Sequence, residues 1–185
     1  RAQREIGLAI GEPPAQRGYT PSVFETLPKL LERSGTSQKG SITGFYTVLV
    51  DGDDMDEPVS DTVRGILDGH IVLNRKLAQA YHFPAIDVLA SISRLSKRVT
   101  GPQTQKAVAA IRRSMAAYAQ SEDMITVGAY QKGSNAEVDA AIELHPAIEN
   151  FLMQEEAEKT TIEKTLTDFG KLAGIEIPAE EWQTT

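Results

Sequence analysis

Residues 41–50 constrain the fold of this chain more than any other segment. They are rich in β-branched and aromatic side chains and are apolar on both faces, as in Ser41-Ile42-Thr43-Gly44-Phe45-Tyr46-Thr47-Val48-Leu49-Val50. A strand buried on both faces is typical of a parallel sheet that is covered by helices. The acidic loop at residues 51–58 follows at the carboxyl end of this strand, where open α/β sheets place functional loops. The segment therefore predicts an α/β architecture.

The spacing of apolar residues predicts the elements around this segment. We expect helices at residues 1–11, 23–31 and 60–68, a short strand at 71–73 and a helix at 74–81. After that helix, the alternation of strands and helices is expected to stop.

The turn Thr100-Gly101-Pro102 is the best candidate for a domain boundary, because a long and uninterrupted helical pattern follows it. The sequence therefore predicts the end of an α/β domain at residues 1–100 and a helical bundle at residues 101–185. Its fold class is α/β followed by all-α.

Within the helical part, three signals place the expected elements. Ser134 and Glu137 have the spacing of a capping box, which predicts a helix start. Pro146 is expected to break or restart the helical pattern. A final amphipathic helix is predicted by Ile162, Leu166, Phe169 and Ala173.

Composition excludes several classes of function. The 185 residues include 19 Lys and Arg against 26 Asp and Glu, which gives a net charge of −7. An acidic chain is poorly suited to nucleic acid, since binding to phosphates needs a basic face. The absence of cysteine excludes disulfides, thiolate metal sites and a cysteine nucleophile. No apolar run is long enough to span a membrane, and the first residue, Arg1, suggests a cut or processed N-terminus.

Two motifs that suggest chemistry have simpler interpretations. The segment Gly35-Thr36-Ser37-Gln38-Lys39-Gly40-Ser41 resembles a phosphate-binding loop, but its order is Lys-Gly-Ser and an expected strand follows it, so we predict a turn. The histidines His70, His82 and His145 have unrelated spacings and no carboxylate arranged as a partner. We therefore predict no metal site.

A family likeness is carried by four runs of residues: Arg4–Pro14, Arg17–Phe24, Gly40–Pro58 and Ile66–Leu73. Together they closely resemble the flagellum-specific protein-export ATPase family. That family is similar to the catalytic subunit of rotary ATP synthases and to the ATPases of virulence-type secretion systems. The likeness is dense over residues 4–100 and continues in register, more thinly, through Ile125–Tyr130 and Ala141–Ile148.

This resemblance implies a hexameric ring of RecA-type ATPase subunits in the cytoplasm, at the base of the flagellar export apparatus. The chain would be the C-terminal half of a RecA-type parallel-sheet nucleotide-binding domain plus the C-terminal helical bundle. The implied cofactors are ATP and Mg²⁺. In the family, the main phosphate and metal ligands lie upstream of the residues that match Arg1, so the 185 residues alone are expected to be inactive.

The resemblance also implies a catalytic role for Arg94. The arginine finger of the family lies in the segment matched by Ser91–Arg94, and it would act in trans on the nucleotide of the neighbouring subunit. A guanidinium offers a rigid fork of donors to the oxygens of a transferring phosphoryl group. The alternative is that Arg94 belongs to a solvated basic cluster with Lys97 and Arg98.

Tyr19 is the second residue to which the resemblance gives a role, the stacking of its ring on adenine. Its alternative role is packing of the turn Gly18-Tyr19-Thr20-Pro21. The other adenine-side aromatic residue of the synthases would fall just past Phe151–Gln154, where this chain has Glu155 and Glu156. We therefore expect a one-sided stack.

The acidic loop matches a loop that meets the central stalk in the synthases. Asp53, Asp54 and Asp56 are the implied contacts with a coiled-coil stalk protein of the export apparatus, and a solvated acidic face is the alternative. The turn at residues 131–135, where the synthases carry an acidic lever, is not acidic here. Other implied partners are regulatory export proteins and chaperone–substrate complexes, with no nucleic acid, at a site peripheral to the membrane export gate.

Three functional hypotheses follow. The first is that the chain is part of a flagellar export ATPase, which is favoured by the resemblance of the sequence at residues 50–73. The second is the ATPase of a virulence-type secretion system, which has the same chemistry. The third is a non-catalytic helical module that docks a stalk protein or chaperones.

Overall fold

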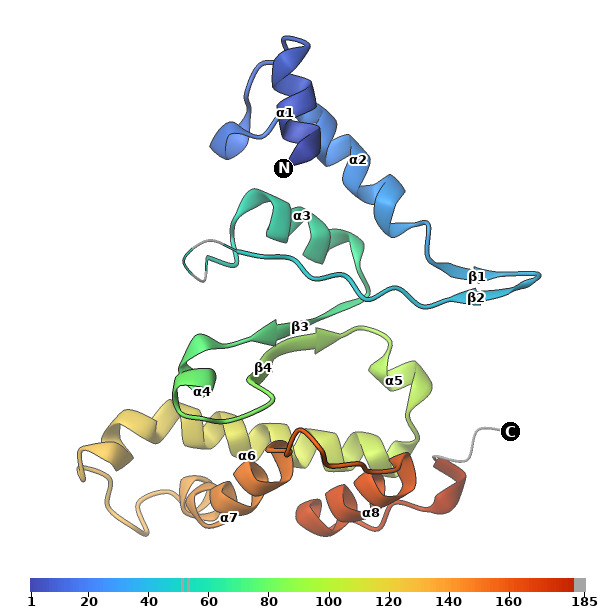
Figure 1. Ribbon diagram of the computed structural model, residues 1–185. Helices are drawn as coiled ribbons and strands as arrows, with labels where there is room; N and C mark the ends of the chain where they lie inside the picture. The colour runs from blue at the N-terminus through green and yellow to red at the C-terminus, as the bar shows by residue number, and fades with distance from the viewer. Residues whose placement is uncertain (51, 53, 182–185) are drawn as a thin grey trace. The chain divides into compact units, whose positions relative to one another are not determined.

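The computed structural model describes residues 1–50, 52 and 54–181 of the chain (Figure 1). It divides into two compact units, Arg1–His70 and Ile71–Thr185. The expected succession of a mixed α/β part and a helical part is present, with a helical second half that begins at Pro102.

The first unit is built on three helices, α1 (Ala2–Ala9), α2 (Pro21–Leu31) and α3 (Pro58–Ile66), with the short helix η1 (Gln16–Gly18) between the first two. These agree with the helices predicted for this part of the sequence. Helix α1 approaches α2 closely because Gly7 has no side chain. A Cβ atom on Gly7 would lie 2.4 Å from Oγ1 of Thr20, which is fully buried just before α2.

The predicted buried strand at residues 41–50 is wrong. Strand β1 (Gly35–Ser37) pairs with strand β2 (Gly40–Ile42) as an antiparallel hairpin, and residues 43–50 form no strand. Phe45 is 92% exposed and Leu49 is 85% exposed. An interior strand needs a hydrogen-bonded neighbour on each side, and no other described segment pairs with residues 43–50. An apolar sequence by itself does not provide those neighbours.

Strand β4 (Ile86–Ser93) is an element that the sequence analysis missed. It forms a two-stranded sheet with β3 (Gly69–Leu73), with helix α4 (Arg75–Gln79) between them in sequence. Its polar residue Asp87 disguised the pattern, because this carboxylate accepts hydrogen bonds from Asn74 Nδ2 at 3.1 Å and from the backbone N–H of Ala90 at 2.9 Å. The alternation of strands and helices therefore continues beyond the point where it was predicted to stop.

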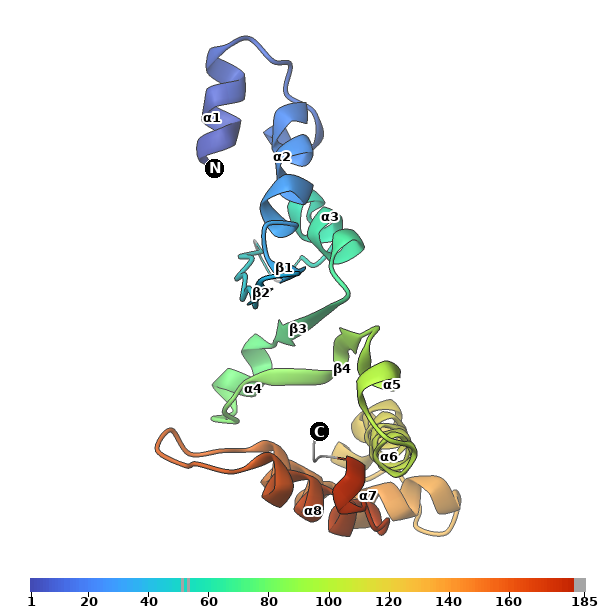
Figure 2. The same ribbon diagram turned by 90° about the vertical axis from the view of Figure 1, so that its right-hand side faces the viewer.

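The helical part of the second unit is organised around one long helix, α6 (Pro102–Thr126), which follows the short helix α5 (Ser96–Val99). Helix α6 contacts β4, α7 (Ala136–Leu152) and α8 (Ile162–Ala173) (Figures 1 and 2). The buried apolar core lies between these elements and is formed by Ala107, Ile111, Val138, Ala141, Ile148 and Ile177. Ala107 and Ala141 are almost completely buried, and their small side chains allow a close approach.

Two details of α7 differ from the prediction. The N-cap is Asn135 rather than Ser134, since Oδ1 of Asn135 accepts hydrogen bonds from the N–H groups of Glu137 (2.9 Å) and Val138 (3.4 Å). Asn and Ser are comparable caps, so the sequence could not decide between neighbours. Helix α7 also continues through Pro146, which lies on its exposed side. The buried Ile148 on the other side of α7 offsets the hydrogen bond lost at the proline.

The C-terminal helix η3 (Ala179–Glu181) closes the second unit against the start of α6. The Glu181 carboxylate accepts hydrogen bonds from the backbone N–H groups of Gln103 and Thr104, both at 2.8 Å, and from the Thr104 hydroxyl at 2.7 Å. These N–H groups have no partner within the helix, and the helix dipole favours a negative charge there. Burial raises the pKa of Glu181, but the hydrogen bonds outweigh it and hold the pKa below its ordinary value of 4.5.

We predict that Glu181→Gln lowers the melting temperature of the chain by a few degrees at neutral pH. Because the folded-state pKa of Glu181 is lowered, its contribution to stability is present above the unfolded pKa and is lost as the pH falls through the folded pKa. The two melting curves should therefore converge in acid. Glu180→Gln, a change at the exposed neighbouring acid, is the matched control. Equal melting temperatures at every pH would contradict the assigned cap.

Candidate functional site

Arg94 follows directly after β4 and precedes α5 in the second unit. Its side chain is exposed, and among the residues that the structure describes nothing hydrogen-bonds to its guanidinium or forms an ion pair with it. Lys97 and Arg98, the other members of the basic cluster considered above, lie exposed on α5. The guanidinium of Arg94 is therefore available to an anionic group from outside this chain.

Tyr19 has an extended backbone conformation, lies between η1 and α2 in the first unit, and is half-buried. Its ring meets the ring of Phe24 edge-on, with 6.2 Å between centroids and an interplanar angle of 71°. The guanidinium carbon of Arg4 lies over the Tyr19 ring at 5.8 Å from its centroid. These contacts occupy part of the surface that a stacked base would need.

The acidic loop is partly neutralised by basic residues from elsewhere in the first unit. Arg17 hydrogen-bonds to the carboxylate of Asp54, and this bond is the main reason that the pKa of Asp54 is lowered. Arg64 donates to the carbonyl of Met55 at 2.7 Å and to the carboxylate of Asp56 at 3.3 Å. The Asp56 side chain is nevertheless 94% exposed. Of the three predicted stalk contacts, Asp53 lies outside the described residues.

An open pocket in the second unit was not anticipated from the sequence. Its volume is about 750 Å³, and aromatic and polar residues line it: Tyr81, Phe83, Pro84, Asn150, Met153, Gln154, Glu155, Glu156 and Glu158. The rings of Tyr81 and Phe83 meet edge-on at 5.5 Å. The backbone N–H of Gln154 donates to the carbonyl of Phe83 at 2.9 Å, which holds the two walls together. The sequence signal that could have indicated this pocket is Tyr81-His82-Phe83-Pro84, which has two aromatic residues beside a turn.

His82, between Tyr81 and Phe83 in sequence, corrects one sequence inference, because it does have a carboxylate partner. Its Nδ1 lies 3.0 Å from Oε2 of Glu149 on α7, and the histidine is only 6% exposed. The two residues are 67 positions apart in sequence, so their pairing could not be inferred from local spacing. Another histidine, His145, stacks on Tyr118 with 3.6 Å between ring centroids. Across the described part of the chain, no three His, Asp or Glu side chains are grouped as metal ligands.

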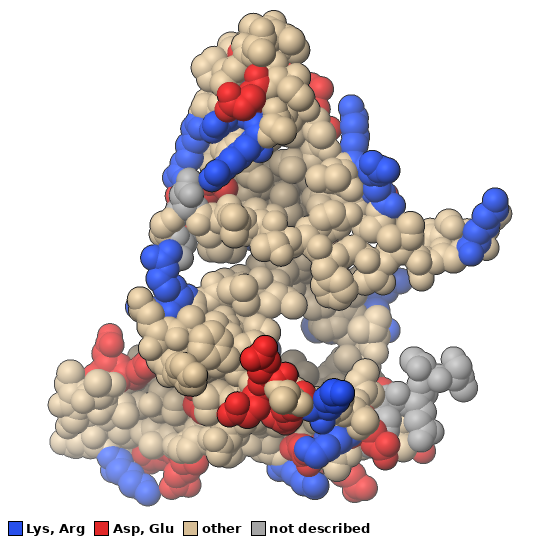
Figure 3. All heavy atoms as spheres, in the orientation of Figure 1, with Lys and Arg blue, Asp and Glu red and all other residues tan. Residues whose placement is uncertain are grey.

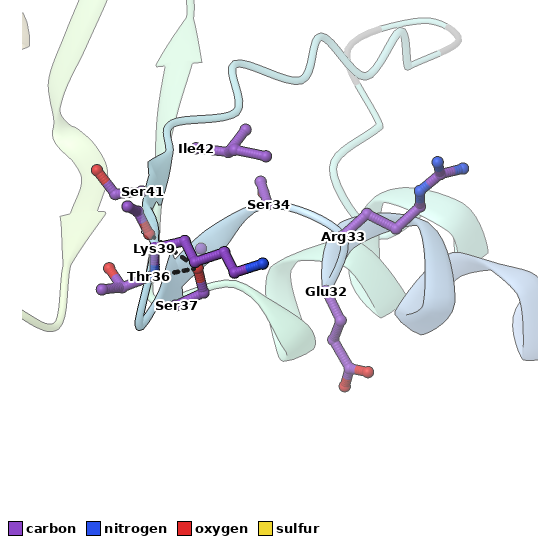
Figure 4. Close-up of a pocket in the computed structure, with 10 residues that line it drawn as sticks. Glu32, Arg33, Ser34, Thr36, Ser37, Lys39, Ser41 and Ile42 are labelled. Carbon is purple, nitrogen blue, oxygen red and sulfur yellow. Dashed lines mark hydrogen bonds between the residues drawn. The ribbon is translucent and has the colours of Figure 1, made fainter.

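The segment that resembles a phosphate loop contains the predicted turn, which joins β1 and β2 in an antiparallel hairpin. Figure 4 shows the open hollow beside β1 and β2, with the side chains of Glu32 and Arg33 pointing away from the hairpin. The turn is held by the Ser37 hydroxyl, which donates to the carbonyl of Gly40 and accepts from the N–H of Lys39, both at 3.2 Å. No helix begins at this turn, so it lacks the aligned N–H groups that bind phosphate.

Charged side chains are unevenly distributed over the second unit. On the face drawn in Figure 3, acidic side chains gather over the helical end of the chain, whereas Lys and Arg are scattered. No helix among the described residues is long and apolar enough to cross a membrane.

Comparison with protein families defines the class of this protein. Residues 1–93 match the model of the ATP synthase alpha/beta family, nucleotide-binding domain, and residues 100–171 match that of the T3SS EscN ATPase C-terminal domain. The fold is thus the C-terminal part of a RecA-type nucleotide-binding domain joined to a C-terminal helical part. The chain belongs to the ATP synthase alpha/beta family.

Individual relatives and solved structures carry more specific names than the family models. The chain is 60% identical over 177 residues to the flagellum-specific ATP synthase of Treponema pallidum, covering 96% of this chain and 40% of that protein. The assembled ATPase EscN from the type III secretion system of enteropathogenic E. coli has the same fold, with a TM-score of 0.90 and 45% identity over 94% of this chain and 42% of that one. EscN in complex with its central stalk EscO gives a TM-score of 0.83 at 44% identity, over 94% of this chain and 41% of that one.

The chain spans about 40% of the length of the curated relatives it matches. The family resemblance inferred from the sequence is confirmed by both family models and by these relatives. The roles of Arg94, Tyr19 and the acidic loop are not decided by these matches and remain predictions.

Proposed function

We propose that this chain is the C-terminal part of an ATPase that energises flagellar (type III) protein export by hydrolysing ATP with Mg²⁺. The observation that carries the proposal is 60% identity to a flagellum-specific ATP synthase over nearly the whole chain. An ATPase of a virulence-type secretion system is the second candidate, supported by the likeness to EscN. Expression of the complete gene in a flagellated bacterium made non-motile by deletion of its own flagellar ATPase distinguishes the two candidates. Restored motility supports the flagellar role.

The ATPase is proposed to act as a hexameric ring, cytoplasmic and peripheral at the export apparatus, with a coiled-coil stalk protein as its central partner. The solved assemblies of EscN, alone and with its stalk EscO, support an oligomer and a stalk partner. Regulatory export proteins and chaperone–substrate complexes are further proposed partners. A non-catalytic docking module is less favoured, because the chain also matches the nucleotide-binding domain.

Two domains, at residues 1–100 and 101–185, are part of the same proposal. The interval between the two matched family models, after residue 93 and before residue 100, supports a boundary there. The compact units of the structure divide earlier, between His70 and Ile71, because β3 and β4 form one sheet and β4 contacts α6. Limited proteolysis of the ATPase, with cleavage near Thr100, would support the proposed boundary.

Arg94 is the proposed arginine finger, acting on the nucleotide of the neighbouring subunit. Its position at the end of a strand, with an exposed side chain, supports this role. The adenine-side contact has two candidate rings. The resemblance points to Tyr19. The open pocket favours Phe83 instead, because Phe83 lines it together with Gln154 and the residues just past it, where the synthases have an aromatic residue.

In a full-length ATPase carrying this sequence, Arg94→Ala is expected to lower kcat by roughly 10³-fold or more. Nucleotide affinity should stay nearly unchanged, because the lost interaction forms in the transition state. Steady-state hydrolysis and equilibrium nucleotide binding measure the two quantities. Arg98→Ala, in the same exposed cluster, is the control and should hydrolyse ATP normally. A normal kcat for Arg94→Ala would return Arg94 to a solvated basic cluster.

Alanine substitution of each ring separates the two adenine-side candidates. Loss of the stacking ring should weaken nucleotide binding by about 1–2 kcal/mol, since that is the usual worth of a base–aromatic stack. Loss of the other ring should leave affinity unchanged and lower only the melting temperature. We expect Phe83→Ala to weaken binding, because Phe83 is 46% exposed beside the pocket. Weaker binding by Tyr19→Ala alone would assign the contact to Tyr19.

Replacing Asp53, Asp54 and Asp56 together by Asn is expected to slow association with the stalk protein and to reduce its salt dependence. Basal hydrolysis should change little. Because Arg17 already neutralises Asp54, Asp56→Asn alone should account for more of the effect than Asp54→Asn alone. Stopped-flow association across a salt series measures this. Identical rates for mutant and parent would leave the loop as a solvated face.

A further inference from the structure

Among the described residues, the side chain of Arg94 forms no hydrogen bond or ion pair. Side chains of helix α6 nevertheless hydrogen-bond to the backbone before and after it. On the N-terminal side, the guanidinium of Arg112 donates to two consecutive carbonyls of β4. Its Nη1 lies 2.7 Å from the carbonyl oxygen of Val88, and its Nη2 lies 3.1 Å from that of Leu89. Arg112 therefore holds the strand that leads to Arg94.

A second side chain of α6 holds the backbone on the other side. Nε2 of Gln105 donates to the carbonyl of Lys97 at 3.0 Å and to the carbonyl of Thr100 at 2.7 Å. These two carbonyls lie within α5 and at its end, a few residues after Arg94. Arg112 and Gln105 are seven residues apart on α6, so they lie on the same face of the helix, two turns from each other.

We propose that Arg112 and Gln105 are positioning residues that set the place of Arg94 by holding the backbone before and after it on α6. The proposal rests on the proposed role of Arg94 as the arginine finger. Both residues use their donors on main-chain carbonyls, and both are half-buried. Because the guanidinium of Arg112 donates through two nitrogens, it fixes the orientation of β4 relative to α6 as well as their distance, whereas a single hydrogen bond would fix only the distance.

The physical need for such residues follows from the chemistry of the finger. Transition-state stabilisation depends on where the guanidinium lies, and a displacement of about 1 Å can cost roughly 100-fold in rate. An exposed side chain without partners inherits its position from its backbone. Helix α6 is a suitable reference, because its start is fixed by Glu181 and its first half is held by the buried residues Ala107 and Ile111.

The test uses full-length ATPase carrying Arg112→Met or Gln105→Met, which remove the donors while keeping similar length. We expect kcat to fall roughly 10- to 100-fold with KM for ATP unchanged. Arg112→Lys, which keeps the charge and one donor nitrogen in place of two, should recover part of the rate. Gln105→Glu should be slower than Gln105→Met because a carboxylate would face two carbonyls. Arg113→Met, an exposed neighbour on α6, is the matched control with parental kcat.

A double-mutant cycle separates positioning from a general structural effect. In the Arg94→Ala background, Arg112→Met and Gln105→Met should lower kcat no further, because the residue they position is gone. An equal loss in both backgrounds would overturn the proposal. Melting curves check folding, and Gln105→Met, which changes a half-buried amide in the first turns of α6, keeps the test valid if Arg112→Met unfolds.

The outcomes also separate this inference from the proposed function. If Arg94→Ala lowers kcat and both methionine variants match the parent, the positioning role is overturned and the finger stands. If Arg94→Ala hydrolyses ATP normally, the finger assignment fails, and the positioning role fails with it.

Discussion

The packing of helix α6 is the constraint on which the second unit depends. This 25-residue helix contacts β4, α7 and α8, and its residues Ala107 and Ile111 form the centre of the buried core with Ala141 and Ile148 of α7. Small residues at two of these positions allow close packing of the helices. Because an isolated two-stranded sheet is only marginally stable in water, β3 and β4 depend on this helix for their support. The fold of β4, the strand that precedes Arg94, therefore follows from the burial of α6.

Much of the helical structure could be predicted from the sequence, because its signals are local. The turn predicted as the boundary, Thr100-Gly101-Pro102, ends at the first residue of α6, and the apolar face of Ile162, Leu166 and Phe169 lies within α8. Helix α8 ends where a left-handed glycine, Gly174 with φ of 65°, allows it to end. Such features depend on neighbours within one or two turns of the chain, which sequence reasoning reads directly.

The strands were predicted less well, because strand pairing is decided by residues far apart in sequence. Residues 41–50 have the composition of a buried strand, but composition does not supply a hydrogen-bonding neighbour. The error for strand β4 is the opposite one, because a strand that exists was not predicted. Its Asp87 is typical of a surface residue in the sequence, and only the fold shows that Asn74 donates a hydrogen bond to it. The same limit applies to the site. The pair His82–Glu149 and the wall contact Phe83–Gln154 each join segments about 70 residues apart.

The arrangement of the second unit bears on which nucleotide each site can contact. The aromatic pocket at Phe83 precedes β4, and Arg94 follows it, so the strand separates them. Eight extended residues span up to roughly 26 Å. A single nucleotide would have to lie along β4 to place its base in the pocket and its terminal phosphate at Arg94. Two different nucleotides, one at each end of the strand, avoid this requirement. That division is what the proposed finger, acting in trans from the end of β4, would need.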